Sequence, residues 1–344
     1  MKTYPLKNIK ILLADGDINI ARVVTQVLRT MGFAEIHHVR DSTQALAYIR
    51  ENPIDILMTE WVLSPLDGIE LARHIRLDKK SPNRGLPIVM LTGKGEMVNV
   101  ETARDAGITE FLVKPFTIQT LFNRLEHLID RPRAFLLHEN YVGPDRRRRA
   151  ADGADKTNRR HMLAQSVAKQ GKDFPDIGTT PILIQPDYEL KRSTGVTAPL
   201  ASIITPAMLT AAQNNIDNLR DESLQWIKED LAQLEAAFTQ VQSTRSHAAR
   251  DQMKEASLSI KSRAGTFGYA LASKIARMLY LFFCTDYESA QAAHNLVVRQ
   301  CVDALKISFS ETLKAPNAVG DELASELQRL IDKQQRKGQP ATFA

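Results

Sequence analysis

The hydrophobic and polar positions of the first 130 residues follow two alternating periods. Five short apolar runs have the length and β-branched content of buried strands, and the five segments between them repeat apolar positions every three or four residues, as amphipathic helices do. Strands that alternate with helices predict an α/β fold with a doubly wound parallel sheet, because parallel strands need crossover connections. The predicted strands are Ile11–Ala14, Glu35–Val39, Asp55–Thr59, Pro87–Leu91 and Glu110–Val113, and the predicted helices are Ile18–Met31, Thr43–Glu51, Gly68–Leu77, Met97–Ala106 and Ile118–Ile129.

The pattern changes after residue 130. Between residues 131 and 204 the periodicity fades and turn-forming residues recur, which predicts a flexible linker that contains one short strand at Ile182–Ile184. Helical periodicity then returns and predicts an all-α bundle over residues 205–337, followed by a disordered tail at 338–344. The expected helices are Ala207–Gln242, Ala248–Arg263, Ala270–Cys284, Ser289–Thr312 and Asp321–Gln335.

Polar residues stand at the carboxyl ends of the predicted parallel strands. Asp15 and Asp17 follow the first strand, Glu60 the third, Thr92 the fourth and Lys114 the fifth. These ends meet along one edge of such a sheet, which is where open α/β sheets bind their ligands. The sequence therefore predicts a functional site that contains acids, a hydroxyl and an amine.

Four segments around this edge resemble, in order and spacing, the site segments of the receiver domains of two-component response regulators. They are ILLADGD (11–17), TEWVLSPLDG (59–68), IVMLTG (88–93) and FLVKPF (111–116). The resemblance covers residues 1–130 and implies a flavodoxin-like strand order of 2-1-3-4-5. It also implies a role in bacterial phosphorelay signalling.

The resemblance assigns a role to individual residues. Glu60 stands in the place of the aspartate that accepts the phosphoryl group, and Thr92 in the place of the switch hydroxyl. Lys114 matches the lysine and Phe111 the switch aromatic residue of the family. The family pattern also implies that Pro115 follows a cis peptide bond.

The same resemblance implies a Mg²⁺ site at Asp15, Glu60 and Val62, with Asp17 as a further candidate ligand. Gly16, however, stands where the family usually has a second acid. Glu60 is longer than aspartate by one carbon–carbon bond, about 1.5 Å, and a misplacement near 1 Å can cost about 10²-fold in rate. The sequence therefore predicts a degenerate site, with Mg²⁺ weakly bound or absent and phosphorylation inefficient.

The role of Glu60 stays open at this point. Its carboxylate could imitate a phosphorylated aspartate by pairing with Lys114 and drawing Thr92 inward, although its charge is smaller than the roughly −1.5 to −2 of a phosphoryl group. It could instead form a purely structural ion pair in a receiver without a switch. An alternative keeps phosphorylation, with Asp15 or Asp17 as the acceptor.

The helical region carries one loose motif. The stretch that begins at Ser257 resembles the His-x-x-Lys-Gly segment of histidine phosphotransfer domains, but Leu258 takes the histidine position when Lys261 is aligned with the lysine. Without an imidazole, this resemblance implies a bundle that has lost its phosphoryl carrier. An ordinary antiparallel bundle explains the pattern equally well. His247 and His294 are interpreted as surface or interface histidines.

The formal charge of +5 has a local origin. Nine lysines or arginines and four acids lie between residues 131 and 160, so the rest of the chain is neutral. This segment includes Arg146, Arg147, Arg148 and Arg149, which we interpret as part of a solvated linker. Binding of nucleic acid through these arginines is the less favoured alternative, because no recognition helix accompanies them.

The remaining composition narrows the class of protein. Cys284 and Cys301 suit buried residues of a reducing cytoplasm better than a disulfide framework. No apolar stretch is long enough to span a membrane. The sequence favours a cytoplasmic, non-enzymatic signalling protein that binds a histidine kinase, a phosphotransfer protein or a downstream protein, with self-association through the helical region as a further option.

Overall fold

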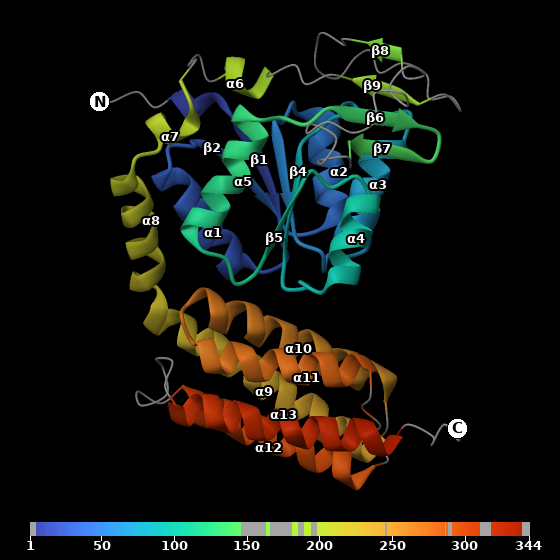
Figure 1. Cartoon of the computed structure of the whole chain (residues 1–344), viewed down its shortest axis with the longest axis vertical. Coiled ribbons are helices and arrows are strands. Elements are labelled where there is room, and N and C mark those ends of the chain that lie inside the picture. Colours follow the sequence, from blue (N-terminus) through green and yellow to red (C-terminus); the bar gives the residue numbers. More distant parts are fainter. Residues whose placement is uncertain are drawn as a thin grey trace, which may run out of the picture. The chain divides into compact units, whose positions relative to one another are not determined.

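The computed structural model describes residues 5–145, 163–165, 181–184, 189–193, 198–244, 246–285, 287, 291–309 and 318–338. The chain divides into two compact units, Met1–Asn215 and Ile216–Ala344. Figure 1 labels the helices and strands of the two units.

A five-stranded parallel sheet forms the centre of the first unit, in the order β2-β1-β3-β4-β5. This order confirms the predicted fold, and every predicted element is present within two residues of its expected ends. The strands are β1 Lys10–Ala14, β2 Glu35–Val39, β3 Ile56–Thr59, β4 Ile88–Thr92 and β5 Glu110–Val113. The helices are α1 Ile18–Thr30, α2 Ser42–Glu51, α3 Gly68–Leu77, α4 Met97–Asp105 and α5 Ile118–Asp130.

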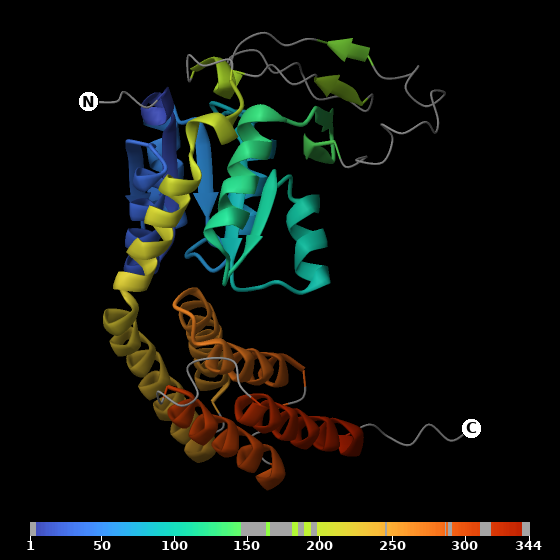
Figure 2. The same cartoon turned by 60° about the vertical axis from the view of Figure 1, so that its left-hand side comes forward.

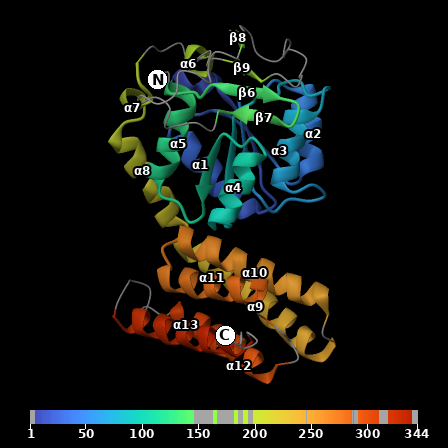
Figure 3. The same cartoon turned by 45° about the vertical axis from the view of Figure 1, so that its right-hand side comes forward.

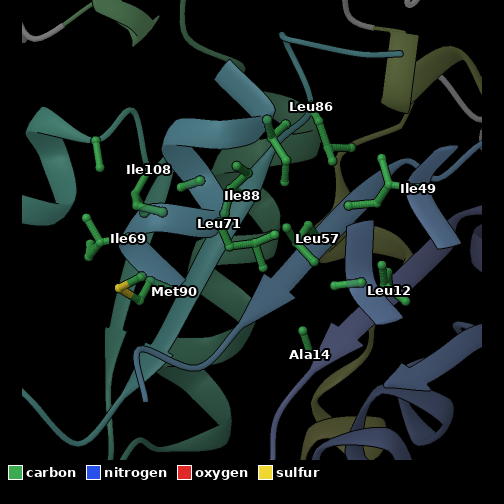
Figure 4. Close-up of a cluster of buried hydrophobic side chains, with 14 of the residues drawn as sticks. Leu12, Ala14, Ile49, Leu57, Ile69, Leu71, Leu86, Ile88, Met90 and Ile108 are labelled. Carbon is green, nitrogen blue, oxygen red and sulfur yellow. The ribbon is translucent and has the colours of Figure 1, made fainter. Parts of the chain in front are cut away.

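Helices cover both faces of this sheet, which explains why its inner strands are continuously apolar. On one face, Leu12, Leu57 and Ile88 come from three neighbouring strands and pack with Ile49 of α2 and Leu71 of α3 (Figure 4). Each of these five side chains is at most 5% exposed. The packed faces hold the strands in register, so the loops at their carboxyl ends have fixed positions.

Side-chain caps define where two helices begin. The Oδ1 atom of Asp67 accepts hydrogen bonds from the backbone N–H groups of Ile69 and Glu70, at 2.9 and 2.8 Å, and the Glu70 carboxylate accepts one from the Asp67 N–H in return. Thr117 begins α5 with a similar reciprocal arrangement. Such caps satisfy N–H groups that have no partner within the helix.

The region after residue 130 differs from the expected flexible linker. Its described parts include a second sheet in the order β7-β6-β9-β8, in which β9 is the short strand predicted at Ile182–Ile184 (Figure 3). The strands are β6 Phe135–His138, β7 Tyr141–Pro144, β8 Leu163–Gln165 and β9 Ile182–Ile184. Strands of three or four residues are too short to give a clear period, so the pattern concealed β6, β7 and β8.

The β6–β7 hairpin packs against helix α3 and the turn between α4 and β5, and the contacts involve two glycines and a buried arginine. A Cβ atom on Gly107 would lie 2.4 Å from the carbonyl oxygen of Val142, and one on Gly143 would lie 2.7 Å from the Cα of Gly107. Arg76 is 1% exposed and donates to the carbonyl oxygens of Gly107 and Arg84, at 3.1 and 2.8 Å. The hairpin is therefore part of the first unit's packing.

The chain then returns along the helices of the receiver. The elements here are α6 Glu189–Ser193, α7 Leu200–Ile203 and α8 Pro206–Asn218. Asp130 accepts a hydrogen bond from the Leu200 N–H at 2.6 Å and pairs with Lys191 at 3.1 Å. Asn215 of α8 donates to the Thr30 hydroxyl of α1 at 2.8 Å, and Figure 2 shows α8 beside α1.

The second unit is helical, as predicted. It contains α9 Arg220–Thr244, α10 His247–Thr266, α11 Ala270–Thr285, α12 Ala292–Ser308 and α13 Ala318–Gly338. The long helix expected over Ala207–Gln242 is divided between α8 and α9 by a turn at Leu219. The helix α13 reaches Gly338, and residues 339–344 of the predicted tail lie outside the described residues.

Two histidines of this unit have different surroundings. His247 is exposed, in agreement with its interpretation. His294 is 5% exposed, and its ring centroid lies 5.2 Å from that of Phe282 in a T-shaped arrangement. Of the two alternatives for His294, surface or interface, the structure excludes the surface, because the aromatic rings around it bury the imidazole. Among the helices that the structure describes, none has the length and apolar character needed to cross a membrane.

Candidate functional site

Lys114 lies at the centre of the polar edge of the parallel sheet. Its Nζ atom donates to Asp15 Oδ2 at 2.9 Å and to Glu60 Oε2 at 2.6 Å. The three residues follow β5, β1 and β3, and they are only 2%, 2% and 9% exposed. The structure thus brings together one ammonium and two carboxylates from segments far apart in the sequence.

These charges alter one another's ionisation. Burial lowers the pKa of Lys114, but the carboxylates of Asp15 and Glu60 outweigh burial and leave that pKa raised. Burial raises the pKa of Glu60, while Lys114 acts to lower it and Asp15 to raise it. We take the charged pair as the state at neutral pH, because an ammonium in hydrogen-bond contact stabilises the charged carboxylate.

Backbone groups hold the other oxygen of each carboxylate. Glu60 Oε1 accepts a hydrogen bond from the Trp61 N–H at 2.7 Å, and Asp15 Oδ1 accepts one from the Asp17 N–H at 2.9 Å. All four carboxylate oxygens therefore have a donor within the protein. This arrangement fixes both side chains around Lys114.

The switch positions of the family lie nearby, but they are connected differently. Thr92 is fully buried, and its hydroxyl oxygen accepts a hydrogen bond from the Lys94 N–H at 3.1 Å. Within the described part of the chain, no hydrogen bond joins Thr92 to Glu60. Phe111 is partly buried and packs against the core cluster on one face of the sheet.

The residues at the metal positions do not fit Mg²⁺, which takes oxygen ligands in near-octahedral geometry. Gly16 has no side-chain ligand, and Val62, whose apolar side chain is 41% exposed, offers only its backbone carbonyl oxygen. Asp17 Oδ1 caps α1 by accepting from the N–H groups of Asn19 and Ile20, at 3.0 and 3.2 Å. In the described residues, no group of three or more acids, histidines or cysteines is placed to hold a metal ion.

Three residues that the sequence reasoning missed border the site. Trp61 is 7% exposed, and the Lys94 ammonium lies 5.2 Å from the centroid of its ring. Trp61 comes two residues after the predicted strand that ends at Thr59, and Lys94 comes three residues after the one that ends at Leu91, which is the signal that could have identified them. A third, His38, places Nε2 2.8 Å from the backbone oxygen of Asp15. The four arginines at 146–149 lie outside the described residues.

A five-stranded parallel sheet of order 2-1-3-4-5, with an acid after β1, a hydroxyl ending β4 and a lysine after β5, defines a receiver. The peptide bond between Lys114 and Pro115 is cis, as the resemblance implied. Residues 11–126 match the family model of the response regulator receiver domain. The chain belongs to this family, and residues 11–126 of its first unit form a receiver of the two-component signalling class.

Curated relatives include the chemotaxis protein CheY-3 of Vibrio cholerae, 32% identical over 125 residues that cover 36% of this chain and 95% of the relative. The chemotaxis protein CheY of Pseudomonas aeruginosa is 32% identical over 122 residues, which cover 36% of this chain and 97% of that protein. Both likenesses are confined to the receiver.

Among solved structures, a putative response regulator from Chloroflexus aurantiacus is 30% identical with a TM-score of 0.34, and covers 36% of this chain and 100% of its own. The receiver domain of sensor histidine kinase PA1611 from Pseudomonas aeruginosa is 28% identical with a TM-score of 0.32. The match covers 35% of this chain and 96% of that one. That receiver has a magnesium ion coordinated in its active-site cleft.

Proposed function

We propose that this chain is a cytoplasmic signalling protein whose receiver acts by binding other proteins, without accepting a phosphoryl group and without catalysis. One observation carries the proposal: Lys114 Nζ lies 2.9 Å from Asp15 and 2.6 Å from Glu60, inside the protein. The cation that would neutralise an incoming phosphoryl group is already neutralised by two internal carboxylates.

The chemistry of phosphoryl transfer supports this proposal. Transfer to a carboxylate requires a nucleophilic oxygen in line with the leaving group and positive charge that stabilises the transferring oxygens. Both oxygens of Glu60 accept hydrogen bonds, from Trp61 and from Lys114. An attack by Glu60 would therefore have to break these contacts before the reaction began.

The two interpretations of Glu60 are not equally supported. A phosphoaspartate mimic should draw the Thr92 hydroxyl toward the carboxylate, whereas Thr92 Oγ1 accepts from the Lys94 N–H at 3.1 Å. This contact favours the receiver as a fixed binding scaffold. Its partners in this proposal are a histidine kinase, a phosphotransfer protein or a downstream signalling protein.

The proposal is tested by the intact mass of the full chain after incubation with Mg²⁺ and acetyl phosphate. The positive control is the Gly16→Asp, Glu60→Asp double variant, which restores both carboxylates of the family pattern. A side chain fits at Gly16, because its Cβ would meet nothing closer than the Arg40 carbonyl oxygen at 3.5 Å. We expect one added phosphoryl group on the double variant alone, and the same addition on the wild type would refute the proposal.

A further inference from the structure

We propose that the Lys114 ammonium is the permanent internal cation of this site, and that the receiver binds no divalent metal ion. The inference rests on the proposed function and deepens it, because it concerns what balances the charge of the carboxylates. It starts from the contacts of the three buried residues at the carboxyl edge of the sheet.

The carboxylate oxygens of the site already have donors, which leaves few ligand positions for a metal ion. Mg²⁺ in proteins usually keeps several waters and uses one or two carboxylates, which must approach it at about 2.0–2.1 Å. Asp15 presents its two oxygens to Lys114 and to the Asp17 N–H. Glu60 presents its two oxygens to Lys114 and to the Trp61 N–H. A metal ion would have to compete with a donor at every one of these oxygens.

The position of the Lys114 ammonium also opposes metal binding. Its Nζ atom bridges the two carboxylates, and its side chain is 3% exposed. If a metal ion displaced it, Lys114 would remain buried with fewer partners, and an unpaired buried charge is strongly unfavourable.

The missing carboxylate at position 16 is a further obstacle to metal binding. Gly16 has no side chain to replace the lost acid, and its neighbour Asp17 is committed to the first turn of α1 through the N–H groups of Asn19 and Ile20. Turning this carboxylate toward the site would leave the start of α1 without its cap. Asp17 therefore does not substitute for the acid that Gly16 lacks.

The experiment measures the response of the full chain to Mg²⁺ alone. The chain has two tryptophans, and Trp226→Phe leaves Trp61, whose N–H binds Glu60, as the reporter of the receiver. Thermal unfolding followed by Trp61 fluorescence, with and without excess MgCl₂, gives the shift in Tm. In this background we compare the wild-type site with the Gly16→Asp, Glu60→Asp pair and with Lys114→Met.

We expect no Mg²⁺-dependent shift for the wild-type site. The Tm of the Gly16→Asp, Glu60→Asp variant should rise by about 3 °C when the Mg²⁺ concentration exceeds the dissociation constant about tenfold. Lys114→Met should also gain a positive shift, because its carboxylates lose their internal cation. If Lys114→Met does not fold, the restored pair still tests the inference.

Stabilisation of the wild-type site by Mg²⁺ as large as that of the restored pair overturns the inference. A folded Lys114→Met protein whose Tm does not change with Mg²⁺ overturns the role given to the ammonium. The result is separable from the proposed function: Mg²⁺ binding without phosphoryl uptake ends only this inference, whereas phosphoryl uptake by the wild type ends the proposed function.

Discussion

The guanidinium carbon of Arg76 lies 5.2 Å from the centroid of the Phe135 ring. Arg76 belongs to α3 of the receiver, and Phe135 begins the β6–β7 hairpin. Burial lowers the pKa of Arg76 to about 9, with Tyr141 acting in the opposite direction, so the side chain is charged at neutral pH. A buried cation held by carbonyl oxygens and an aromatic face thus joins the receiver to the segment that follows it.

Replacing Arg76 tests this connection. Arg76→Met keeps the aliphatic volume but leaves the carbonyl oxygens of Gly107 and Arg84 without their donor. We expect a loss of about 3 kcal/mol in the free energy of unfolding, since each buried unsatisfied group costs about 1–3 kcal/mol. Urea denaturation measures it. Arg73→Met, at an exposed position of the same helix, is the control and should change stability little; equal losses would contradict the role of Arg76.

The backbone contact at Gly107 gives a second prediction. Its φ of +83° favours glycine, and an added Cβ would lie 2.4 Å from the Val142 carbonyl oxygen. Gly107→Ala should destabilise the first unit by about 1–3 kcal/mol and increase hydrogen exchange of the β6–β7 amides. Gly16→Ala, whose Cβ has room, is the matched control. Unchanged exchange in the Gly107 variant would show that the hairpin does not depend on this contact.

The pH dependence of stability reports on Glu60. Its pKa in the folded protein is raised from the ordinary value of 4.5 by burial, which outweighs the opposing effect of Lys114. A raised pKa means that the folded state binds the proton more tightly than the unfolded chain. The stabilisation from Glu60 is therefore full below pH 4.5 and is lost as the pH rises through the folded pKa.

Relative to Glu60→Gln, the wild type should thus lose stability between pH 4.5 and neutral pH, by about 1.4 kcal/mol for each unit by which the pKa is raised. Urea denaturation of both proteins across this range measures the difference. A wild type that gains stability over the same interval would mean that Lys114 outweighs burial and lowers the pKa of Glu60.

The capping role of Asp17 gives a further prediction. Asp17→Ala removes the acceptor of the Asn19 and Ile20 N–H groups and should cost about 1 kcal/mol, the usual effect of losing a cap. Asp17→Asn retains a capping oxygen and should lose much less. A deficit in both variants that appears only when Mg²⁺ is present would instead identify Asp17 as a metal ligand.

The pattern of the sequence was enough to predict the receiver sheet and the residues of its polar edge. Regular alternation of buried strands and amphipathic helices left few topologies, and strand ends in a parallel sheet must meet at one edge. Asp15, Glu60, Thr92 and Lys114 could therefore be chosen from the pattern and the family resemblance. The length of Glu60 and the glycine at position 16 already indicated an altered site.

The contacts among these residues, in contrast, could be seen only in the folded protein. The spacing of residues does not encode atomic positions. It therefore could not show that Lys114 donates to Glu60, or that Thr92 accepts from the Lys94 N–H and has no bond to Glu60. The β6–β7 hairpin was missed for a related reason. Its strands are too short to show a period. Its position beside Arg76 and Gly107 depends on contacts between residues more than 30 positions apart, and tertiary packing determines such contacts, not the local sequence.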